Sequence, residues 1–470
     1  MLFSEAAFFV FFSAYLFFHF LVPSTYRVYL VIAGSTVFYA WWRIDYLWVP
    51  YSLTLIAWYG VRWIEGSSGP DVKRQRLTTT LIVLFLPLII VKYTYFFTVD
   101  VAGPLVGIER LIAEPEVLLW ALPLGISFIT FTVTAYIVDV YRGRYRPEDK
   151  LSRLLAYVLF FPHLIAGPIL RPHELLPQLK KFRNAFDAKF TVGVAIFTLG
   201  LVKKLVFADQ IADVVDPIFA DGADPTGWQY LLGIYGFSVQ IYCDFSGYTD
   251  MAVGLAYILR IRLPTNFRRP YSASSIVEFW RCWHITLSSW LRDYLYIPLG
   301  GSRSGRAQQF ANAMITMTLG GLWHGANWTF VIWGGLHGLA IGAVHFLRAV
   351  SRGKAPPIPK WLCVVFTFHF VTLAWVYFRA PNVSSAHRVL SEVAFDADWS
   401  NLGGFISENL FPLVLIIVFL LTHRFDQHAR LRLAARKVNK GFFWPFLAMA
   451  WVIAITVSQG NSAKFIYFDF

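Results

Sequence analysis

The chain has 470 residues, of which 57% are hydrophobic, 18% are aromatic and only 15% are charged. Soluble globular domains carry about 25% charged residues, so this composition excludes an ordinary water-soluble fold and indicates a protein that lies in lipid. The net charge of +13 does not indicate nucleic-acid binding, because the basic residues form short blocks between apolar runs, as in the cytoplasmic loops of membrane proteins.

The apolar runs predict an all-α membrane protein that crosses the bilayer many times. The first 22 residues lack a basic amino-terminal region and a small-residue cleavage site, so we expect an uncleaved span rather than a signal peptide. A spanning helix needs about 20 apolar residues. The sequence predicts about eleven such helices, at residues 2–22, 26–40, 46–64, 77–97, 117–141, 191–207, 228–259, 327–347, 361–378, 410–422 and 442–458.

Residues 151–170 are also apolar, but Pro162, His163, Gly167 and Pro168 interrupt them. A broken segment is tolerated at membrane depth only where protein or a cavity satisfies its backbone groups. We expect this segment to be re-entrant or peripheral. No linker separates domains, so residues 1–470 are predicted to form one integral domain with a core stretch at 240–348.

The distribution of charge predicts the orientation of the chain. Basic blocks lie at residues 62–76, 142–150, 171–189, 260–306, 348–360 and 424–440, and acidic loops lie at 209–224 and 392–408. Basic loops stay in the cytoplasm, which places both termini on the periplasmic or extracellular side. Lys203 and Lys204 do not fit, because they fall near the outer end of a predicted span. Either they line an internal cavity, or that span has other bounds.

Residues 276–296 are predicted to form a helix with a polar stripe of Arg281, His284, Ser288 and Arg292. One interpretation is an amphipathic helix at the membrane interface, with tryptophans at the headgroups and arginines on phosphates. That interpretation does not exclude a functional His284. Ionisable groups among membrane spans usually face a protein interior or a cavity, which makes this stretch a candidate site.

A second histidine, His324, lies in the sequence GGLWHGAN. Gly320, Gly321 and Gly325 leave room for the close approach of backbone or ligand, and Asn327 lies three residues on, where a helix would let it orient the imidazole. His324 is either a structural histidine or a general base, because a desolvated imidazole stays neutral.

A further polar patch, Asp244, Ser246, Tyr248 and Asp250, lies in QIYCDFSGYTDMA. It either joins helices by hydrogen bonds or belongs to the site. The three cysteines have no ligand spacing, and no embedded acid cluster suggests a metal, so no metal site is predicted. The chain has no G-x-S-x-G, P-loop or H-E-x-x-H motif.

Several long motifs resemble the membrane-bound O-acyltransferase family, in the bacterial branch that acetylates alginate. They are FYAWWR at 38–43, FPHLIAGPILRP at 161–172, QIYCDFSGYTDMA at 240–252, NFRRPYSASSIVEFWRCWHITLSSWLRDYLYIPLGG at 266–301, GGLWHGANWTFVIWGGLHG at 320–338 and the terminal FIYFDF. The resemblance implies a multi-helix fold with re-entrant segments around a central tunnel or funnel. It also implies transfer of an acyl group from a thioester to a hydroxyl. In this branch the group is acetyl, the expected donor is acetyl-CoA, and no cofactor is bound.

The resemblance also implies the site and the partners. The family's two histidines correspond to His324, as base toward the attacking hydroxyl, and His284, which positions or polarises. The predicted supporting residues are Asn327, Trp323, Asp293, Arg281, Arg292, Ser288, Asp244 and Tyr248, and the predicted contacts to donor phosphates are Arg268, Arg269 and Arg303. The expected acceptor is an extracellular polysaccharide, reached through an extracytoplasmic acetyltransferase at the bacterial cytoplasmic membrane. Membrane lipid, and no nucleic acid, is the other expected partner.

Two other functions remain open. One is D-alanyl transfer to teichoic acid from a carrier-protein thioester. The other is transport of an acyl group without chemistry, although the inverted repeats typical of transporters are not visible in the sequence.

Overall fold

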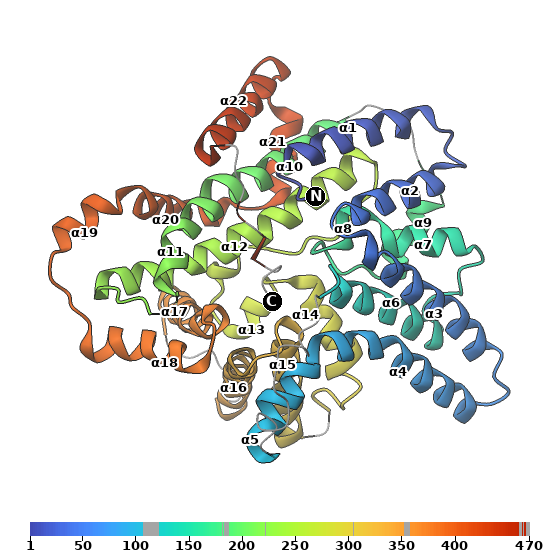
Figure 1. Cartoon of the computed structure of the whole chain (residues 1–470), viewed down its shortest axis with the longest axis horizontal. Coiled ribbons are helices and arrows are strands. Elements are labelled where there is room, and N and C mark those ends of the chain that lie inside the picture. Colours follow the sequence, from blue (N-terminus) through green and yellow to red (C-terminus); the bar gives the residue numbers. More distant parts are fainter. Residues whose placement is uncertain are drawn as a thin grey trace. The chain divides into compact units, whose positions relative to one another are not determined.

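The described part of the chain is mostly helical, and no β-strand occurs in it (Figure 1). This confirms the predicted all-α class. The computed structural model describes residues 1–106, 122–180, 182, 188–220, 222–303, 305–351, 358–459, 463 and 465–466. These residues divide into two compact units, Met1–Val194 with Ala252–Pro264, and Ala195–Met251 with Thr265–Phe470. The single integral domain stays a prediction.

The first unit contains nine helices among its described residues. They are α1 (Ala6–Leu21), α2 (Arg27–Ala40), α3 (Trp48–Glu65), α4 (Pro70–Tyr95), α5 (Gly103–Val106), α6 (Ile126–Tyr141), α7 (Leu151–Leu159), α8 (Phe161–Leu164) and α9 (Pro172–Leu179). The predicted spans at 2–22, 26–40, 46–64 and 77–97 all fall on helices. For the span at 117–141, residues 117–121 lie outside the described part.

The predicted interruption of residues 151–170 is present at Phe160. Its backbone leaves the helical region (φ −47°, ψ 101°), which ends α7 and starts the short α8. Nearby groups satisfy the broken backbone: the His163 Nε2 atom lies 2.9 Å from the Tyr157 carbonyl, and the Tyr157 hydroxyl donates to the Leu170 carbonyl. Whether this segment re-enters the membrane from one face stays a prediction.

The second unit holds the central stretch. Its helices are α11 (Asp209–Ile218), α13 (Ile276–Trp280), α14 (Ile285–Leu291), α15 (Arg306–His324), α16 (Trp328–Val350), α17 (Lys360–Arg379), α18 (Val383–Ser391), α19 (Leu402–Glu408), α20 (Leu410–Thr422), α21 (His428–Lys437) and α22 (Lys440–Ser458). Two more helices, α10 (Ala188–Val202) and α12 (Gly227–Ile258), have residues in both units. The last six predicted spans, from 191–207 to 442–458, coincide with α10, α12, α16, α17, α20 and α22.

The span predicted at 191–207 is longer than expected. A π-helical segment, Lys203–Ala208, joins α10 to α11, and residues Lys189–Ile218 form one apolar helix of 30 residues. The expected acidic loop at 209–224 therefore begins inside a helix. The loop prediction was wrong there because Asp209 is buried beside Lys204, with 2.8 Å between Oδ1 and Nζ, and a paired carboxylate does not require water. Likewise, α19 occupies part of the acidic segment 392–408.

Within the described residues, five helices are long and apolar enough to cross a membrane: Pro70–Ala102, Lys189–Ile218, Trp328–Arg348, Lys360–Arg379 and Lys440–Ser458. Leu402–Glu408 and Leu410–Phe425, bent by 81° at their junction, make a sixth if they count as one span. The apolar helices α1, α2 and α6 are shorter. These helices support a multi-pass membrane protein, whereas about eleven spans around a tunnel stays a prediction.

Helices α15 and α16 run side by side with their backbones in direct contact (Figure 1). A Cβ atom at Gly321 would lie 2.2 Å from the Phe330 carbonyl oxygen, and one at Gly334 would lie 2.3 Å from the Met317 carbonyl oxygen. Only glycine permits so close an approach. Of the three glycines around His324, Gly321 thus permits the close approach of backbone, one of the two possibilities that the sequence left open.

Candidate active site

His284 lies at a sharp break in the chain, so the predicted single helix at 276–296 was wrong. Helix α13 ends at Trp280 and α14 begins at Ile285, with His284 between them in the left-handed region (φ 40°, ψ 55°). A non-glycine residue adopts this conformation at a cost and only where its surroundings impose it. The predicted stripe of polar residues therefore does not follow one helical face.

Asn266 holds this break in place. Its carbonyl oxygen accepts a hydrogen bond from the Ile285 N–H, with an N···O distance of 2.9 Å. Its side-chain Oδ1 accepts from the N–H and the hydroxyl of Thr286, at 3.1 and 2.9 Å, and lies 3.2 Å from Nδ1 of His284. The start of α14, residues 284–286, is thus bound to a residue 18 to 20 positions earlier.

The imidazole of His284 is fully buried among aromatic rings. Its centroid lies 4.7 Å from that of Phe245, 6.4 Å from that of Phe267 and 6.1 Å from that of Trp323. His284 lies outside the helices long enough to span a membrane, and burial lowers its pKa to about 3. The imidazole is therefore neutral near pH 7.

His324 is the last residue of α15 and is also buried. Its ring centroid lies 4.9 Å from that of Trp323, 5.2 Å from that of Trp333 and 5.3 Å from that of Phe378, and all three rings meet it edge-on. The helix ends at the next residue, Gly325, where a Cβ atom would lie 2.0 Å from the Phe330 ring. Aromatic packing and helix termination thus fix this histidine.

Trp323 connects the two histidines, because its ring contacts both imidazoles. The structure therefore brings together three predicted site residues from two separate segments. His284 comes from the break before α14, and Trp323 and His324 come from the end of α15. A third histidine, His337, is also buried. It contacts the rings of Trp280 and Trp333, and its Nδ1 accepts a hydrogen bond from the Trp280 indole N–H.

A cavity of about 440 Å³ is lined by residues of α13, α14, α15 and α16, and its lining does not include His284 or His324. Ile285, which directly follows His284, and Thr316, two turns before His324, both line it. Three predicted residues, Arg281, Ser288 and Arg292, line it as well, with His345. They gather around one cavity although the predicted continuous helix is broken.

The other predicted residues lie elsewhere. Asp293 forms a two-point ion pair with its neighbour Arg292, with 2.7 Å between Oδ1 and Nε. Arg303 is exposed, and Arg269 donates to the carbonyl of Arg424. Among the described residues, the lining of the 440 Å³ cavity does not include Arg268, Arg269 or Arg303.

The predicted role of Asn327 in orienting His324 was wrong. Its Nδ2 donates to the Pro381 carbonyl, and its Oδ1 accepts from the Thr329 N–H. The prediction required a helix through this position, but α15 stops at His324 and α16 starts at Trp328. Asn327 therefore belongs to the start of α16 and ties it to Pro381, the second residue after α17.

Two carboxylates of the polar patch on α12, those of Asp244 and Asp250, form ion pairs with Lys204 and Lys203. These are the two lysines that lay near the outer end of a predicted span. Lys204 lies between Asp209 and Asp244, with 2.8 Å from Nζ to one oxygen of each. Lys203 pairs in the same way with Asp250 and Asp426, at 2.7 and 2.6 Å. Pairing of this kind lets charged groups lie inside a membrane protein.

These lysines lie beside a close backbone contact. Gly200 on α10 and Gly247 on α12 touch, since a Cβ at Gly200 would lie 2.4 Å from the Gly247 carbonyl oxygen. Lys203 and Lys204 follow within about one turn of that contact. Their ammonium groups therefore reach carboxylates on α12.

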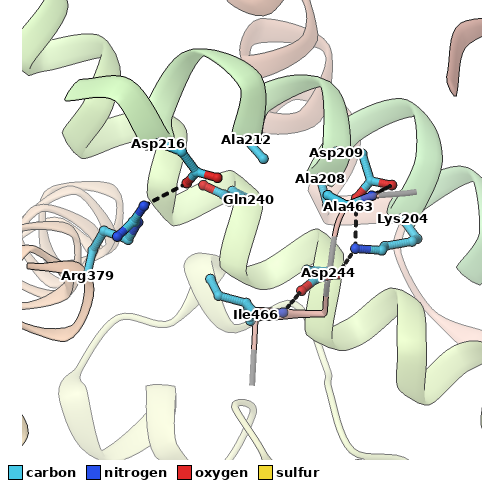
Figure 2. Close-up of a pocket in the computed structure, with 10 residues that line it drawn as sticks. All are labelled: Lys204, Ala208, Asp209, Ala212, Asp216, Gln240, Asp244, Arg379, Ala463 and Ile466. Atoms are coloured by element: carbon cyan, nitrogen blue, oxygen red, sulfur yellow. Dashed lines mark hydrogen bonds and ion pairs between the residues drawn. The ribbon is translucent and has the colours of Figure 1, made fainter. Parts of the chain in front are cut away.

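Lys204 also lines a second cavity, of about 390 Å³ (Figure 2). Asp216 and Arg379 form an ion pair at one end, with 2.8 Å between Oδ1 and Nη2. At the other end, the Asp209 and Asp244 carboxylates accept hydrogen bonds from the backbone N–H groups of Ala463 and Ile466, as Figure 2 shows for Ile466 and Asp244. One interpretation of Lys203 and Lys204, that they line a cavity, is thus correct for Lys204.

Asp244 directly precedes Phe245, whose ring packs on His284, and Tyr248 lies about one turn after Phe245 on α12. The Tyr248 ring lies 4.8 Å from that of Phe465. These two predicted residues therefore lie on the helix that contacts His284. Sequence reasoning missed Asn266, for which the only signal was its place at the start of the motif NFRRPY, and it missed the partners Asp209 and Asp426.

Comparisons with known proteins agree on the family. The family model of membrane-bound O-acyltransferases matches residues 150–386. A probable alginate O-acetylase of Azotobacter vinelandii is 41% identical over 405 residues, which cover 85% of this chain and 79% of that protein. A peptidoglycan O-acetyltransferase of Helicobacter pylori is 38% identical over 392 residues, covering 77% and 73%. A teichoic acid D-alanyltransferase of Bacillus subtilis is 29% identical over 282 residues, covering 56% and 70%. This chain therefore belongs to the membrane-bound O-acyltransferase family.

Proposed function

We propose that this protein takes an acetyl group from a cytoplasmic thioester, namely acetyl-CoA, and passes it across the bacterial cytoplasmic membrane. The acetyl group then modifies hydroxyls of an extracellular polysaccharide such as alginate. The observation that carries the proposal is the pair of buried histidines on Trp323, in a chain about 40% identical to proteins named for alginate O-acetylation.

In the proposed reaction, His324 removes the proton of the attacking hydroxyl. The hydroxyl oxygen forms a bond to the thioester carbonyl carbon, the carbon–sulfur bond breaks, and the thiolate sulfur receives the proton. Positioned acid–base catalysis of this kind contributes about 10²–10⁴-fold in rate. The aromatic rings around both imidazoles support this role, because they keep water from the activated acyl group.

The 440 Å³ cavity is the proposed donor site. Arg281 and Arg292 bring positive charge to it, and guanidinium groups form strong charge-assisted hydrogen bonds with phosphates. Both residues lie in the basic segment 260–306, which the charge pattern assigns to the cytoplasm. We propose that the pantetheine arm of the donor follows the apolar wall toward Ile285.

The 390 Å³ cavity of Figure 2 is the proposed acceptor-side opening. It adjoins the end of α11, in the acidic segment that the charge pattern places outside. The opening has little room for a long glycan, which supports a hand-off to an extracytoplasmic acetyltransferase. In this proposal the partner receives acetyl at the opening and delivers it to the polymer.

Reconstitution in liposomes tests the proposal. Labelled acetyl-CoA is supplied on the face that carries Arg303, and alginate is placed on the other face, with or without a periplasmic acetyltransferase. We expect labelled polymer only when both proteins are present. A matched control is His369→Gln, because His369 is exposed and bonded to the Val365 carbonyl of its own helix; it should retain activity that His324→Gln loses.

Three outcomes would contradict parts of the proposal. Efficient labelling of polymer by this protein alone would refute the hand-off. Activity only with a D-alanyl carrier protein would instead establish the D-alanyl transferase function. Transfer at the wild-type rate by His324→Gln would leave transport of an acyl species as the function.

A further inference from the structure

The carboxamide of Asn266 is a point at which several hydrogen bonds converge beside His284. The Asn266 side chain is 2% exposed. Its Oδ1 accepts from the Thr286 N–H and the Thr286 hydroxyl, and it lies 3.2 Å from Nδ1 of His284.

The chemistry of these contacts fixes where the hydrogen atoms lie. A backbone N–H can only donate, so the carboxamide atom that faces Thr286 must be the oxygen. An amide oxygen only accepts, so the His284 Nδ1 atom that contacts the same oxygen must carry a hydrogen. A neutral imidazole has one N–H and one lone pair. The lone pair of His284 is therefore on Nε2.

We propose that Asn266 is a positioning residue that holds His284 in the Nδ1–H tautomer, so that Nε2 is the ring atom that accepts a hydrogen bond during acyl transfer. This inference rests on the proposed function for the role of His284 and refines it. A neutral His284 in this tautomer cannot donate a hydrogen bond from Nε2 to the thioester carbonyl. Its Nε2 instead orients the attacking hydroxyl by accepting a hydrogen bond from it in the ground state, before that proton passes to His324.

The surroundings of His284 support a single tautomer. The rings of Phe245, Phe267 and Trp323 pack on the imidazole from three directions and lower the local dielectric constant, which strengthens a well-aligned hydrogen bond. Each of these three aromatic residues has a titratable residue next to it in the sequence. They are Asp244 beside Phe245, Arg268 beside Phe267 and His324 beside Trp323.

The tautomer can be read without turnover, by ¹⁵N nuclear magnetic resonance of protein with labelled histidine in lipid. The His284 signals are assigned as those absent from His284→Gln. We expect a protonated Nδ1 and an unprotonated Nε2 in the wild type near pH 7. The reverse assignment in the wild type would overturn the inference, whatever the protein transfers.

Two substitutions test the link to the reaction. Asn266→Leu removes the acceptor, so the Nδ1–H tautomer should be lost and kcat should fall about 10²-fold, the lower end of general acid–base catalysis, with KM little changed. Asn266→Asp keeps the acceptor and adds a negative charge, which favours protonated His284. The acid limb of its rate profile should move to higher pH by about 1–3 units, as expected for an opposite charge at this distance.

Asn312→Asp is the matched control. Asn312 lies on α15 and is also a fully buried amide, and its side chain donates a hydrogen bond to the Gly301 carbonyl. Its acid limb should stay at the wild-type pH. Equal loss of activity in all three variants, with no movement of the acid limb in Asn266→Asp, would mean that Asn266 is merely structural. If Asn266→Leu does not fold, the inference is still tested by the ¹⁵N spectrum of the wild type and by the pH–rate profile of Asn266→Asp. A correct tautomer in a protein without acetyl transfer would refute the proposed function alone.

Discussion

The contact between α15 and α16 predicts a sharp effect of adding one methyl group at Gly321. A Cβ atom there would lie 2.2 Å from the Phe330 carbonyl oxygen and 3.1 Å from its carbon. Ordinary contacts between such atoms begin near 3.5 Å, so Gly321→Ala must push the two helices apart by about 1 Å. The obstacle is backbone, which cannot rotate away as a side chain can.

The magnitude has two parts. Overpacking of a tight contact costs about 1–3 kcal/mol of folding free energy, and the added methyl recovers less than about 1 kcal/mol of helix propensity. Gly321 lies one turn before His324, so the displacement also moves the imidazole. A misplacement of about 1 Å in an active site costs about 10²-fold in rate. We therefore expect a lower thermal midpoint and about 10²-fold slower transfer.

Gly335→Ala in α16 is the matched control for Gly321→Ala. No heavy atom of the described neighbours lies within 4 Å of a Cβ at Gly335, so this substitution should leave the rate unchanged and raise the thermal midpoint slightly. The midpoints are measured by fluorescence-detected size-exclusion chromatography after heating in detergent, and the rates by acetylation in liposomes. A wild-type midpoint and rate for Gly321→Ala would refute the reasoning.

Three other predictions follow from the site and the charge pattern. His324→Ala should abolish glycan acetylation while the protein still accumulates in the membrane; wild-type acetyl content would contradict its assignment as base. Lys204→Met removes the cation between two buried carboxylates and should destabilise the protein by about 3–5 kcal/mol, and adding Asp244→Asn should restore part of that loss in the same heating assay. Reporter fusions after Lys73 should be cytoplasmic and those after Asp398 periplasmic; the same location for both would break the topology.

The helices were largely predictable because each depends on a local apolar run. Residues 228–259 and 361–378, for example, match α12 and α17 closely. The ends of helices were less predictable where a buried charge is neutralised by a partner. Asp209 was predicted in a loop because the sequence does not show that it pairs with Lys204, five residues earlier in the same helix.

The candidate site was predicted in its members but not in its geometry. His284, Trp323 and His324 were identified from polar residues in apolar surroundings, and they do lie together. The break at His284 was not predictable, because it depends on hydrogen bonds from Asn266, outside the segment. Asn327 was misassigned for the related reason that helical spacing fails once a helix stops.

The π-helical segment Lys203–Ala208 lies inside the helix Lys189–Ile218, and because of it the number of residues in this helix cannot change freely. Successive residues of an α-helix point about 100° apart, yet Lys203 and Lys204 are both buried, each between its own two carboxylates. A π-turn holds one residue more than an α-turn, so losing one residue here would restore α-helical spacing without breaking the helix. It would also turn α11 about 100° relative to α10 and separate the charges. Natural variants should therefore tolerate substitutions in this turn more readily than deletions or insertions.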